Sequence, residues 1–182
     1  FRTVLPADTI FLKDLFDLYS YEKYINGIKM FGYELDDYLE YSYGLWFKTM
    51  DGANDNALKF ARNNEGELIY SDRYETYQLE NRYYNFDAAA GIKYTVDLAK
   101  PVGNRVEIMN LASGEEFYAD SLYKVAVNSY RASGGGGHFQ KGAGMSSETV
   151  KERTYFSSQR DLRHYLAQYM LANTPYNPEV IS

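Results

Sequence analysis

Apolar positions recur at helical spacing near the start of the chain. The stretch "YELDDYLEYSYGLWFKTM", residues 33–50, carries apolar or small residues three and four positions apart: Leu35, Tyr38, Leu39, Ser42, Leu45 and Trp46. Its acidic residues fall mostly elsewhere on the helical wheel: Glu34, Asp36, Asp37 and Glu40. A 3.6-residue period with polar residues on the other side predicts an amphipathic helix.

A second helical pattern lies near the end of the chain, in "SSQRDLRHYLAQYMLAN", residues 157–173. Ser157 or Ser158 can cap its beginning, and the helix is expected to end before Pro175. Five residues are predicted to form one face: Leu162, Tyr165, Leu166, Tyr169 and Met170.

Four shorter stretches rich in β-branched and aromatic residues predict strands. They are "YINGIKMF" (24–31), "GIKYTVDL" (91–98), "RVEIMNL" (105–111) and "LYKVAVNSY" (122–130). Helices and strands do not alternate strictly, which favours an α+β fold, a mixed sheet packed with helices, over a doubly wound parallel sheet. Residues 51–82 are polar and weakly periodic, so we expect a long loop with some local structure. At 182 residues the default is one domain.

Composition narrows the class of protein. The formal net charge of -6 argues against a duplex nucleic-acid partner, because such binders gather Lys and Arg on one face. The chain has no cysteine, which excludes disulfides, thiolate metal sites and thiol catalysis. No apolar run approaches the roughly 20 residues of a membrane span. The opening "FRTVLPADTIF" lacks signal-peptide order and begins without Met, so we expect a fragment or processed form.

The candidate chemistry is sparse. A hydrolytic metal centre needs several converging His, Asp and Glu ligands, and the chain has two histidines. His164 is expected to be structural, whereas His138 follows four glycines and could touch a ligand. The acidic pairs Asp36–Asp37 and Glu115–Glu116 are adjacent in sequence, so their side chains diverge and are expected to be solvated. "SGGGG" is neither a phosphate-binding loop nor a dinucleotide fingerprint, and no serine stands in a nucleophile elbow.

The unusual residues are 20 tyrosines and a glycine run in "NSYRASGGGGHF", residues 128–139. Tyrosine suits half-buried surfaces and planar or sugar-like ligands, although most tyrosines are expected in the core and its rim. The glycines could form a flexible connector. If a strand ends there, they could instead let a flat ligand lie against the backbone beside the ring of Tyr130. Stacking a base on an aromatic ring is worth roughly 1–3 kcal/mol.

The segment "VNSYRASGGGG" resembles the C-terminal domain of the 5'-nucleotidase family, which includes UDP-sugar hydrolase and 2',3'-cyclic-nucleotide 2'-phosphodiesterase. "DLFDLYSYEKYINGIKMFGYELDDYLEYS", "YYNFDAAAGIKYTVDLAKPVGNRV" and "DLRHYLAQYM" are similar to further segments of that domain, in the same order. The resemblance covers nearly the whole chain. It implies that this domain, residues 1–182, binds the nucleoside, while an N-terminal metallophosphatase domain absent from the chain holds two metal ions and hydrolyses the phosphate ester.

The resemblance also implies site residues. The family's two base-stacking aromatics fall on Tyr21 and Tyr130, which looks like the cyclic phosphodiesterase branch. A base-contacting Asn of the family is replaced by Lys23, and an Asp of the glycine loop in the two-phenylalanine branch is replaced by Gly136. Base selectivity is then looser, or is carried by Asn85, Asp87 or the backbone. The remaining implied site residues are Arg2 at the phosphate, Arg131 beside the ligand or paired with carboxylates, Gly135 in the loop, and Tyr84 and Phe86 in the pocket wall, with Phe86 alternatively in the core.

The resemblance implies a nucleotide- or nucleoside-binding domain of an exported, periplasmic phosphoesterase, a 5'-nucleotidase or a 2',3'-cyclic-nucleotide phosphodiesterase. No catalytic residue and no cofactor are expected in this domain, and divalent metals are expected in the absent one. A non-catalytic sugar- or protein-binding module and a scaffold without a small ligand are the alternatives.

Overall fold

A three-stranded sheet organises the part of the chain that the structure describes, residues 9–174 of a computed structural model. Its strand order is β6-β1-β7, with β1 (Ile25–Phe31) between β6 (Leu122–Asn128) and β7 (Thr154–Ser157). Both neighbours run antiparallel to β1. The α+β class is confirmed, and one detail of it changes. The described strand pairs are all antiparallel. Strands β6 and β7 run in the same direction, but they do not pair with each other because β1 lies between them.

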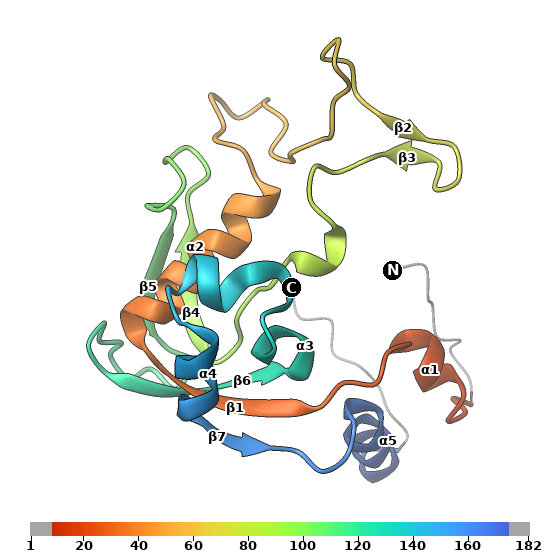
Figure 1. Cartoon of the computed structure of the whole chain (residues 1–182), viewed down its shortest axis with the longest axis vertical. Helices are drawn as coiled ribbons and strands as arrows, with labels where there is room; N and C mark the ends of the chain where they lie inside the picture. Colours follow the sequence, from red (N-terminus) through yellow and green to blue (C-terminus); the bar gives the residue numbers. More distant parts are fainter. Residues whose placement is uncertain (1–8, 175–182) are drawn as a thin grey trace.

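Helix α2 (Gly32–Trp46) follows β1 directly and covers one face of this sheet (Figure 1). The predicted apolar stripe is confirmed in its central part, since Leu35, Tyr38, Leu39 and Ser42 are buried. The helix packs on a single-turn π-helix, η3 (His138–Gly142), which in turn contacts the short helix α4 (Ser147–Arg153). The core residues shared by these elements are Ile28, Met30, Tyr38, Phe139, Ala143, Met145 and Val150.

Two acidic residues of α2 are buried, which corrects the expectation that its carboxylates lie away from the core. Glu34 accepts hydrogen bonds from Arg153 and from the backbone N–H of Phe31, at 2.7 and 2.8 Å. Glu40 accepts the backbone N–H groups of Gly103, Arg105 and Val106. Full pairing explains their burial, because a carboxylate leaves water only when its oxygens find donors.

A second layer follows the helix. The hairpin of β4 (Ile92–Val96) and β5 (Val106–Leu111) lies beside α2. These are the strands predicted at residues 91–98 and 105–111. Residues 48–82 form an arm that projects from the body (Figure 1) and contains only the two-residue strands β2 (Tyr70–Ser71) and β3 (Thr76–Tyr77). The expected long loop with local structure is confirmed.

The C-terminal helix α5 (Leu162–Ala172) packs beside α1 (Asp14–Leu18), where the Arg163 guanidinium lies 4.2 Å from the ring centroid of Phe16. The N-cap of α5 is Asp161, whose side chain accepts the N–H of His164. The prediction that Ser157 or Ser158 caps this helix is wrong. Ser158 is engaged elsewhere because its hydroxyl accepts the N–H of Ile25 on β1.

The predicted single face of α5 is wrong in part. Tyr165 and Tyr169 are exposed, and the helix that packs against α5 is the short α1. His164 is exposed, as expected of a structural surface residue.

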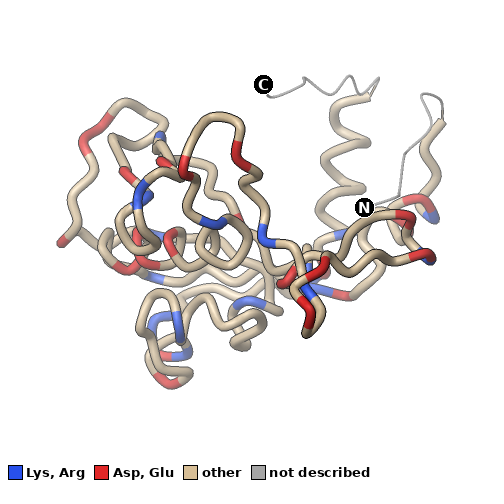
Figure 2. Tube along the Cα trace, turned by 90° about the horizontal axis from the view of Figure 1, so that it is seen from above, with Lys and Arg blue, Asp and Glu red and all other residues tan. Residues whose placement is uncertain are grey.

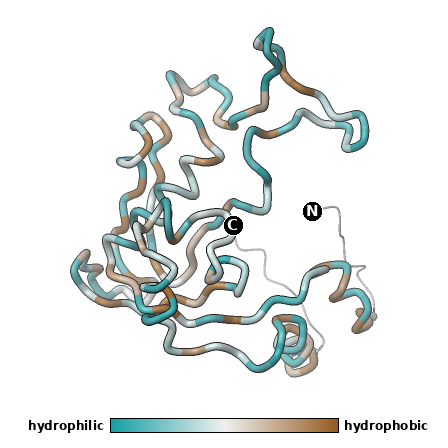
Figure 3. The backbone as a smooth tube through the Cα atoms, in the orientation of Figure 1, coloured by the Kyte–Doolittle hydropathy of each residue, from teal (hydrophilic) through white to brown (hydrophobic). Residues whose placement is uncertain are grey.

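Polarity is distributed evenly along the described chain. Acidic and basic residues are interspersed, without a long run of one sign (Figure 2). Hydrophobic and hydrophilic residues alternate over short distances (Figure 3). Within residues 9–174, no helix combines the length and hydropathy of a transmembrane segment.

Candidate functional site

The glycine run is folded tightly around Tyr130. Strand β6 ends at Asn128, whose side chain accepts the N–H of Arg131 at 3.0 Å and caps the one-turn helix α3 (Ser129–Ala132). The chain then enters the 3-10 turn η2 (Gly135–Gly137). A Cβ atom at Gly135 would lie 2.5 Å from Cε2 and Cζ of Tyr130. Glycine at this position therefore lets the tyrosine ring rest on the backbone, and the alternative of a loose connector does not describe this loop.

Arg131 fastens the loop to a segment more than 40 residues away in sequence. Its side chain is 3% exposed and pairs with both oxygens of Asp87, at 2.6 and 2.8 Å. The same guanidinium donates to the carbonyls of Tyr84 (2.9 Å) and Gly135 (3.1 Å), and lies 3.4 Å from Asn85 Oδ1. Of the two roles considered for Arg131, the structure shows the pairing with a carboxylate, and the partner, Asp87, is half-buried.

Asp87 joins this pair to helix α2. Its Oδ2 accepts the hydroxyl of Tyr38 at 2.6 Å, and its backbone exchanges two hydrogen bonds of 2.7 Å with Ser42. Burial acts to raise the pKa of the Asp87 carboxyl, but the hydrogen bonds from Arg131 and Tyr38 outweigh it and hold that pKa below its usual value. The carboxylate is therefore ionised at neutral pH.

His138 lies beneath the loop and is fully buried, so it does not reach a ligand surface. Its Nε2 is 4.0 Å from Asp87 Oδ2, and its ring contacts those of Tyr38 and Tyr41. Burial, together with the charge of Arg131, lowers the pKa of His138 to about 4. The imidazole is therefore neutral at pH 7 and packs as part of the core.

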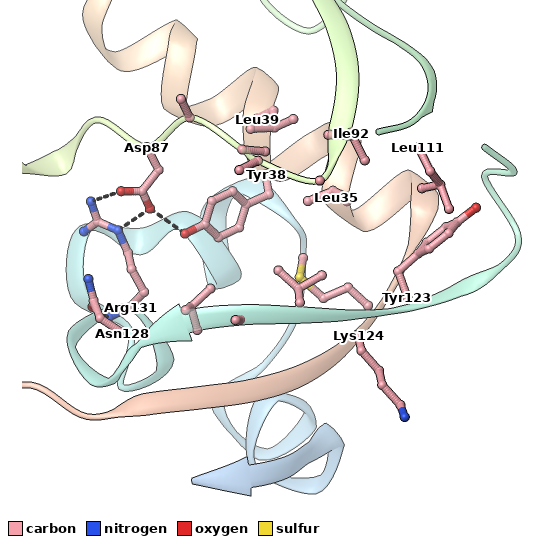
Figure 4. A pocket seen from close by; sticks show the side chains of 18 residues that line it. Leu35, Tyr38, Leu39, Asp87, Ile92, Leu111, Tyr123, Lys124, Asn128 and Arg131 are labelled. Carbon is pink, nitrogen blue, oxygen red and sulfur yellow. Dashed lines mark hydrogen bonds and ion pairs between the residues drawn. The ribbon is translucent and has the colours of Figure 1, made fainter. Parts of the chain in front are cut away.

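A cavity of about 740 Å³ lies between α2, residues 87–92 and β6. Figure 4 shows Asp87, Arg131 and the Tyr38 hydroxyl together at one end, and Ile92, Leu111 and Tyr123 toward the other. Tyr21, Tyr84 and Tyr130 do not line it. The Arg131–Asp87 pair thus faces this largely apolar cavity on one side and contacts the Tyr130 loop on the other. Of the cavity and the loop around Tyr130, the loop is the one that presents an aromatic ring on which a planar ligand can stack.

The other predicted site residues divide between surface and core. Tyr84 is exposed, and its ring meets that of Tyr130 edge-on, at 6.4 Å between centroids. Asn85 Oδ1 lies 3.5 Å from the Tyr130 hydroxyl. Phe86 is half-buried and packs against three rings at the end of α2, those of Tyr43, Trp46 and Phe47.

Tyr21, in the segment between α1 and β1, is 76% exposed. Its pairing with Tyr130 across a base stays a prediction. Arg2 lies outside the described residues.

Two residues of the site, Tyr19 and Tyr38, were not found from the sequence. The Lys23 ammonium makes cation–π contacts with two rings. Its Nζ lies 5.4 Å from the ring centroid of Tyr19 and 5.2 Å from that of Tyr130. Burial raises the pKa of Tyr19. Tyr38 was assigned to the core face of a helix, and the signal available was its hydroxyl, because a buried tyrosine needs a hydrogen-bond partner.

Metal-ligating side chains do not gather in the part of the chain that the structure describes. Across residues 9–174, no group of three or more His, Cys, Asp or Glu side chains is arranged to hold a metal ion.

Comparison with known proteins places this geometry in a family. The family described as "5'-nucleotidase, C-terminal domain" matches residues 1–142. The trifunctional nucleotide phosphoesterase protein YfkN of Bacillus subtilis is 26% identical over 190 residues, which cover 98% of this chain and 11% of that protein. The 2',3'-cyclic-nucleotide 2'-phosphodiesterase/3'-nucleotidase of Salmonella typhimurium is 30% identical over 130 residues, covering 65% of this chain and 18% of that protein.

Solved structures agree on the fold. A crystal structure from Staphylococcus aureus, described as a 5'-nucleotidase in complex with alpha-ketoglutarate, superposes with a TM-score of 0.62 at 20% identity, over 93% of this chain and 28% of that one. The NAD nucleotidase (NadN) of Haemophilus influenzae gives 0.55 at 16% identity, over 93% and 26%. The chain belongs to the 5'-nucleotidase C-terminal domain family, and it spans less than a fifth of the curated relatives it matches.

Proposed function

We propose that this chain is the nucleoside-binding domain of a two-domain, metal-dependent phosphoesterase, and that Tyr130 and Tyr21 hold the base between them. The observation that carries the proposal is the ring of Tyr130, packed on the Gly135 backbone and partly open to solvent. A ring fixed in this way can stack on a heterocycle without first losing its own freedom of motion, and stacking needs no particular base.

The proposal assigns base binding to this domain and hydrolysis to another. Arg131 and Asp87 act as positioning residues, because their hydrogen bonds hold Tyr84, Asn85 and Gly135 in place around the ring. Hydrolysis is assigned to an N-terminal metallophosphatase domain with divalent metals, since this chain matches the family of 5'-nucleotidase C-terminal domains and the phosphoesterases it resembles are much longer. Export to the periplasm is part of the same proposal, as are a 5'-nucleotide or 2',3'-cyclic nucleotide as substrate.

Nucleoside titration of the 182-residue chain tests the binding role. We expect saturable binding of a purine nucleoside, followed by NMR shifts or calorimetry, loss of that binding in Tyr130→Leu, and its retention in Tyr130→Phe, which keeps the ring. Tyr77→Leu is the control, because Tyr77 is an exposed tyrosine on the arm. Equal binding by the wild type and Tyr130→Leu would refute the stacking role.

Phosphate release tests where the chemistry lies. With Mn²⁺ added, the isolated chain should release no phosphate from AMP and should not open 2',3'-cyclic AMP to a nucleoside monophosphate. Turnover by this chain alone would show that the reaction is not confined to another domain.

Exposed tyrosines on the arm favour the second candidate, a sugar- or protein-binding module. Tyr70, Tyr74 and Tyr77 are 47–56% exposed within one short segment. Saturable binding of a sugar, sensitive to Tyr77→Leu and with no response to nucleosides, would support this module in place of the first proposal.

A further inference from the structure

Lys23 brings a positive charge to the ring of Tyr130. Its backbone carbonyl accepts the N–H of Leu162 at 2.8 Å, which ties residue 23 to the start of α5. Its ammonium lies 5.2 Å from the Tyr130 ring centroid and 5.4 Å from that of Tyr19. Within residues 9–174, Lys23 forms no ion pair with a carboxylate. The charge is therefore available to a ligand that stacks on Tyr130.

The hydrogen-bond acceptors around the same ring each have at least one donor from the protein itself. The carbonyls of Tyr84 and Gly135 accept from Arg131, and the carbonyl of Gly136 accepts the Tyr41 hydroxyl at 3.2 Å. The Asp87 carboxylate is engaged by Arg131 and Tyr38.

Asn85 Oδ1 is also engaged, since it accepts from Arg131 Nη1 at 3.4 Å and lies 3.5 Å from the Tyr130 hydroxyl. Each of these acceptors is already paired at least once, whereas the three N–H bonds of the Lys23 ammonium have no carboxylate partner in the described chain and can be donated to a ligand.

A charged group that can only donate hydrogen bonds discriminates between purines. Guanine and hypoxanthine present two adjacent acceptors, O6 and N7, which a lysine ammonium can contact together. Adenine presents N7 beside an exocyclic amino group, whose hydrogens would point at the ammonium. We propose that Lys23 makes this site selective for 6-oxopurine nucleosides, of the guanosine and inosine kind, over adenosine.

This inference rests on the proposed nucleoside-binding function and adds the choice of base. A base that stacks on Tyr130 displaces the ammonium from above the ring toward the base edge. The four-carbon stem of lysine allows this movement, because its charge is carried on a flexible chain. The ammonium leaves a cation–π interaction with the ring and forms two charge-assisted hydrogen bonds with the base in its place.

Titration with inosine and adenosine tests the inference, since the two nucleosides differ only in the 6-oxo and 6-amino groups and the N1 proton that accompanies the former. For the 182-residue chain we expect inosine to bind about tenfold more tightly than adenosine, within the range of a bidentate base contact. In Lys23→Asn the preference should fall to about twofold or less, because an amide both donates and accepts. In Lys23→Met the binding of inosine should weaken and that of adenosine should change little.

Lys124→Asn is the matched control. The Lys124 ammonium lies 5.5 Å from the ring of Tyr155, in the same kind of contact, and Figure 4 shows it pointing away from the other labelled side chains. This variant should keep the tenfold preference. Melting temperatures of all variants within a few degrees of the wild type would show that the fold is intact.

The outcomes separate the two proposals. Adenosine binding as tightly as inosine, or a preference that survives Lys23→Asn, would overturn the role of Lys23 and leave nucleoside binding standing. No response to either nucleoside would overturn the proposed function itself.

Discussion

Replacing Arg131 with methionine should unfold the loop that surrounds Tyr130, and it should do so in a pH-dependent way. The change leaves the Asp87 carboxylate without its ion pair, and leaves the carbonyls of Tyr84 and Gly135 without a donor. Removing one partner of a buried pair costs about 3–5 kcal/mol. We expect about 3 kcal/mol, the low end, because the Asp87 side chain is 25% exposed and keeps its hydrogen bond from Tyr38.

The pH dependence follows from the pKa of Asp87. In the wild type this pKa lies below its usual value, so the pair stabilises the fold above the unfolded pKa and this contribution is lost as the pH falls through the folded one. In Arg131→Met, burial remains and the guanidinium does not, so the pKa of Asp87 should rise above its usual value. As the pH falls, the Asp87 carboxyl of the variant takes up a proton, and the buried charge without a partner disappears. The difference in unfolding free energy between the variant and the wild type should therefore shrink toward pH 4.

Urea and thermal unfolding at pH 7 and pH 4 measure this effect. At pH 7 we expect the melting temperature of Arg131→Met to fall by about 6–12 °C, given roughly 2–4 °C per kcal/mol for a domain of this size. Lys48→Met is the control, since the Lys48 side chain is 42% exposed, against 3% for Arg131, so losing its pair with Asp55 should cost far less. A loss below about 1 kcal/mol for Arg131→Met at pH 7, or a deficit that grows toward pH 4, would refute the reasoning.

Adding Asp87→Asn to Arg131→Met should restore part of the stability. The amide oxygen still accepts the Tyr38 hydroxyl, and no buried charge is left unpaired. Equal stability of the single and double variants, measured by urea unfolding at pH 7, would show that the cost comes from the lost carbonyl contacts instead.

Three further predictions concern the loop and the titrating core. Gly135→Ala should cost about 1–3 kcal/mol and weaken nucleoside binding, because its methyl would overlap the Tyr130 ring, whereas Gly52→Ala, with open space around it, should be neutral; calorimetry of both variants checks this. The pKa of His138 is lowered to about 4, so the unfolded chain takes up a proton that the folded chain does not, and stability should fall between about pH 6.5 and 4 by up to about 1.4 kcal/mol per pH unit; His138→Leu should remove this slope in urea unfolding. Burial and the neighbouring Glu40 raise the pKa of Asp36 to about 6, so its contribution is present at low pH and is lost as the pH rises through 6; Asp36→Asn should therefore change the same pH profile with the opposite sign.

Local patterns were sufficient to predict most of the secondary structure. The four predicted strands are found within one or two residues of their expected bounds, and α2 begins one residue before its predicted stretch, because period and β-branched content are short-range signals. The helix α4 and the strand β7 were not predicted. Strand β7 is four residues long with three exposed, so pairing with β1, not its own composition, makes it a strand.

The site was predictable only as far as its residues are local. Tyr130 and the glycines adjoin in sequence, and their neighbourhood was expected. The partner of Arg131 was not, because Asp87 is 44 residues away and nothing in either local pattern connects them. The buried Glu34 and Glu40 escaped prediction for the same reason, since their donors come from Arg153 and from the turn before β5.

The hydrogen bonds of Arg131 have a consequence for the speed and cost of recognition. Four consecutive glycines would ordinarily exact a large entropic penalty at the moment a ligand arrives. In this protein the entropy is lost during folding, when the Arg131 guanidinium forms its hydrogen bond to the Gly135 carbonyl and the ring of Tyr130 packs on the backbone. If a nucleoside binds at this ring as proposed, it meets a preorganised surface, so differences in affinity among nucleosides should lie mainly in their dissociation rates and not in their association rates.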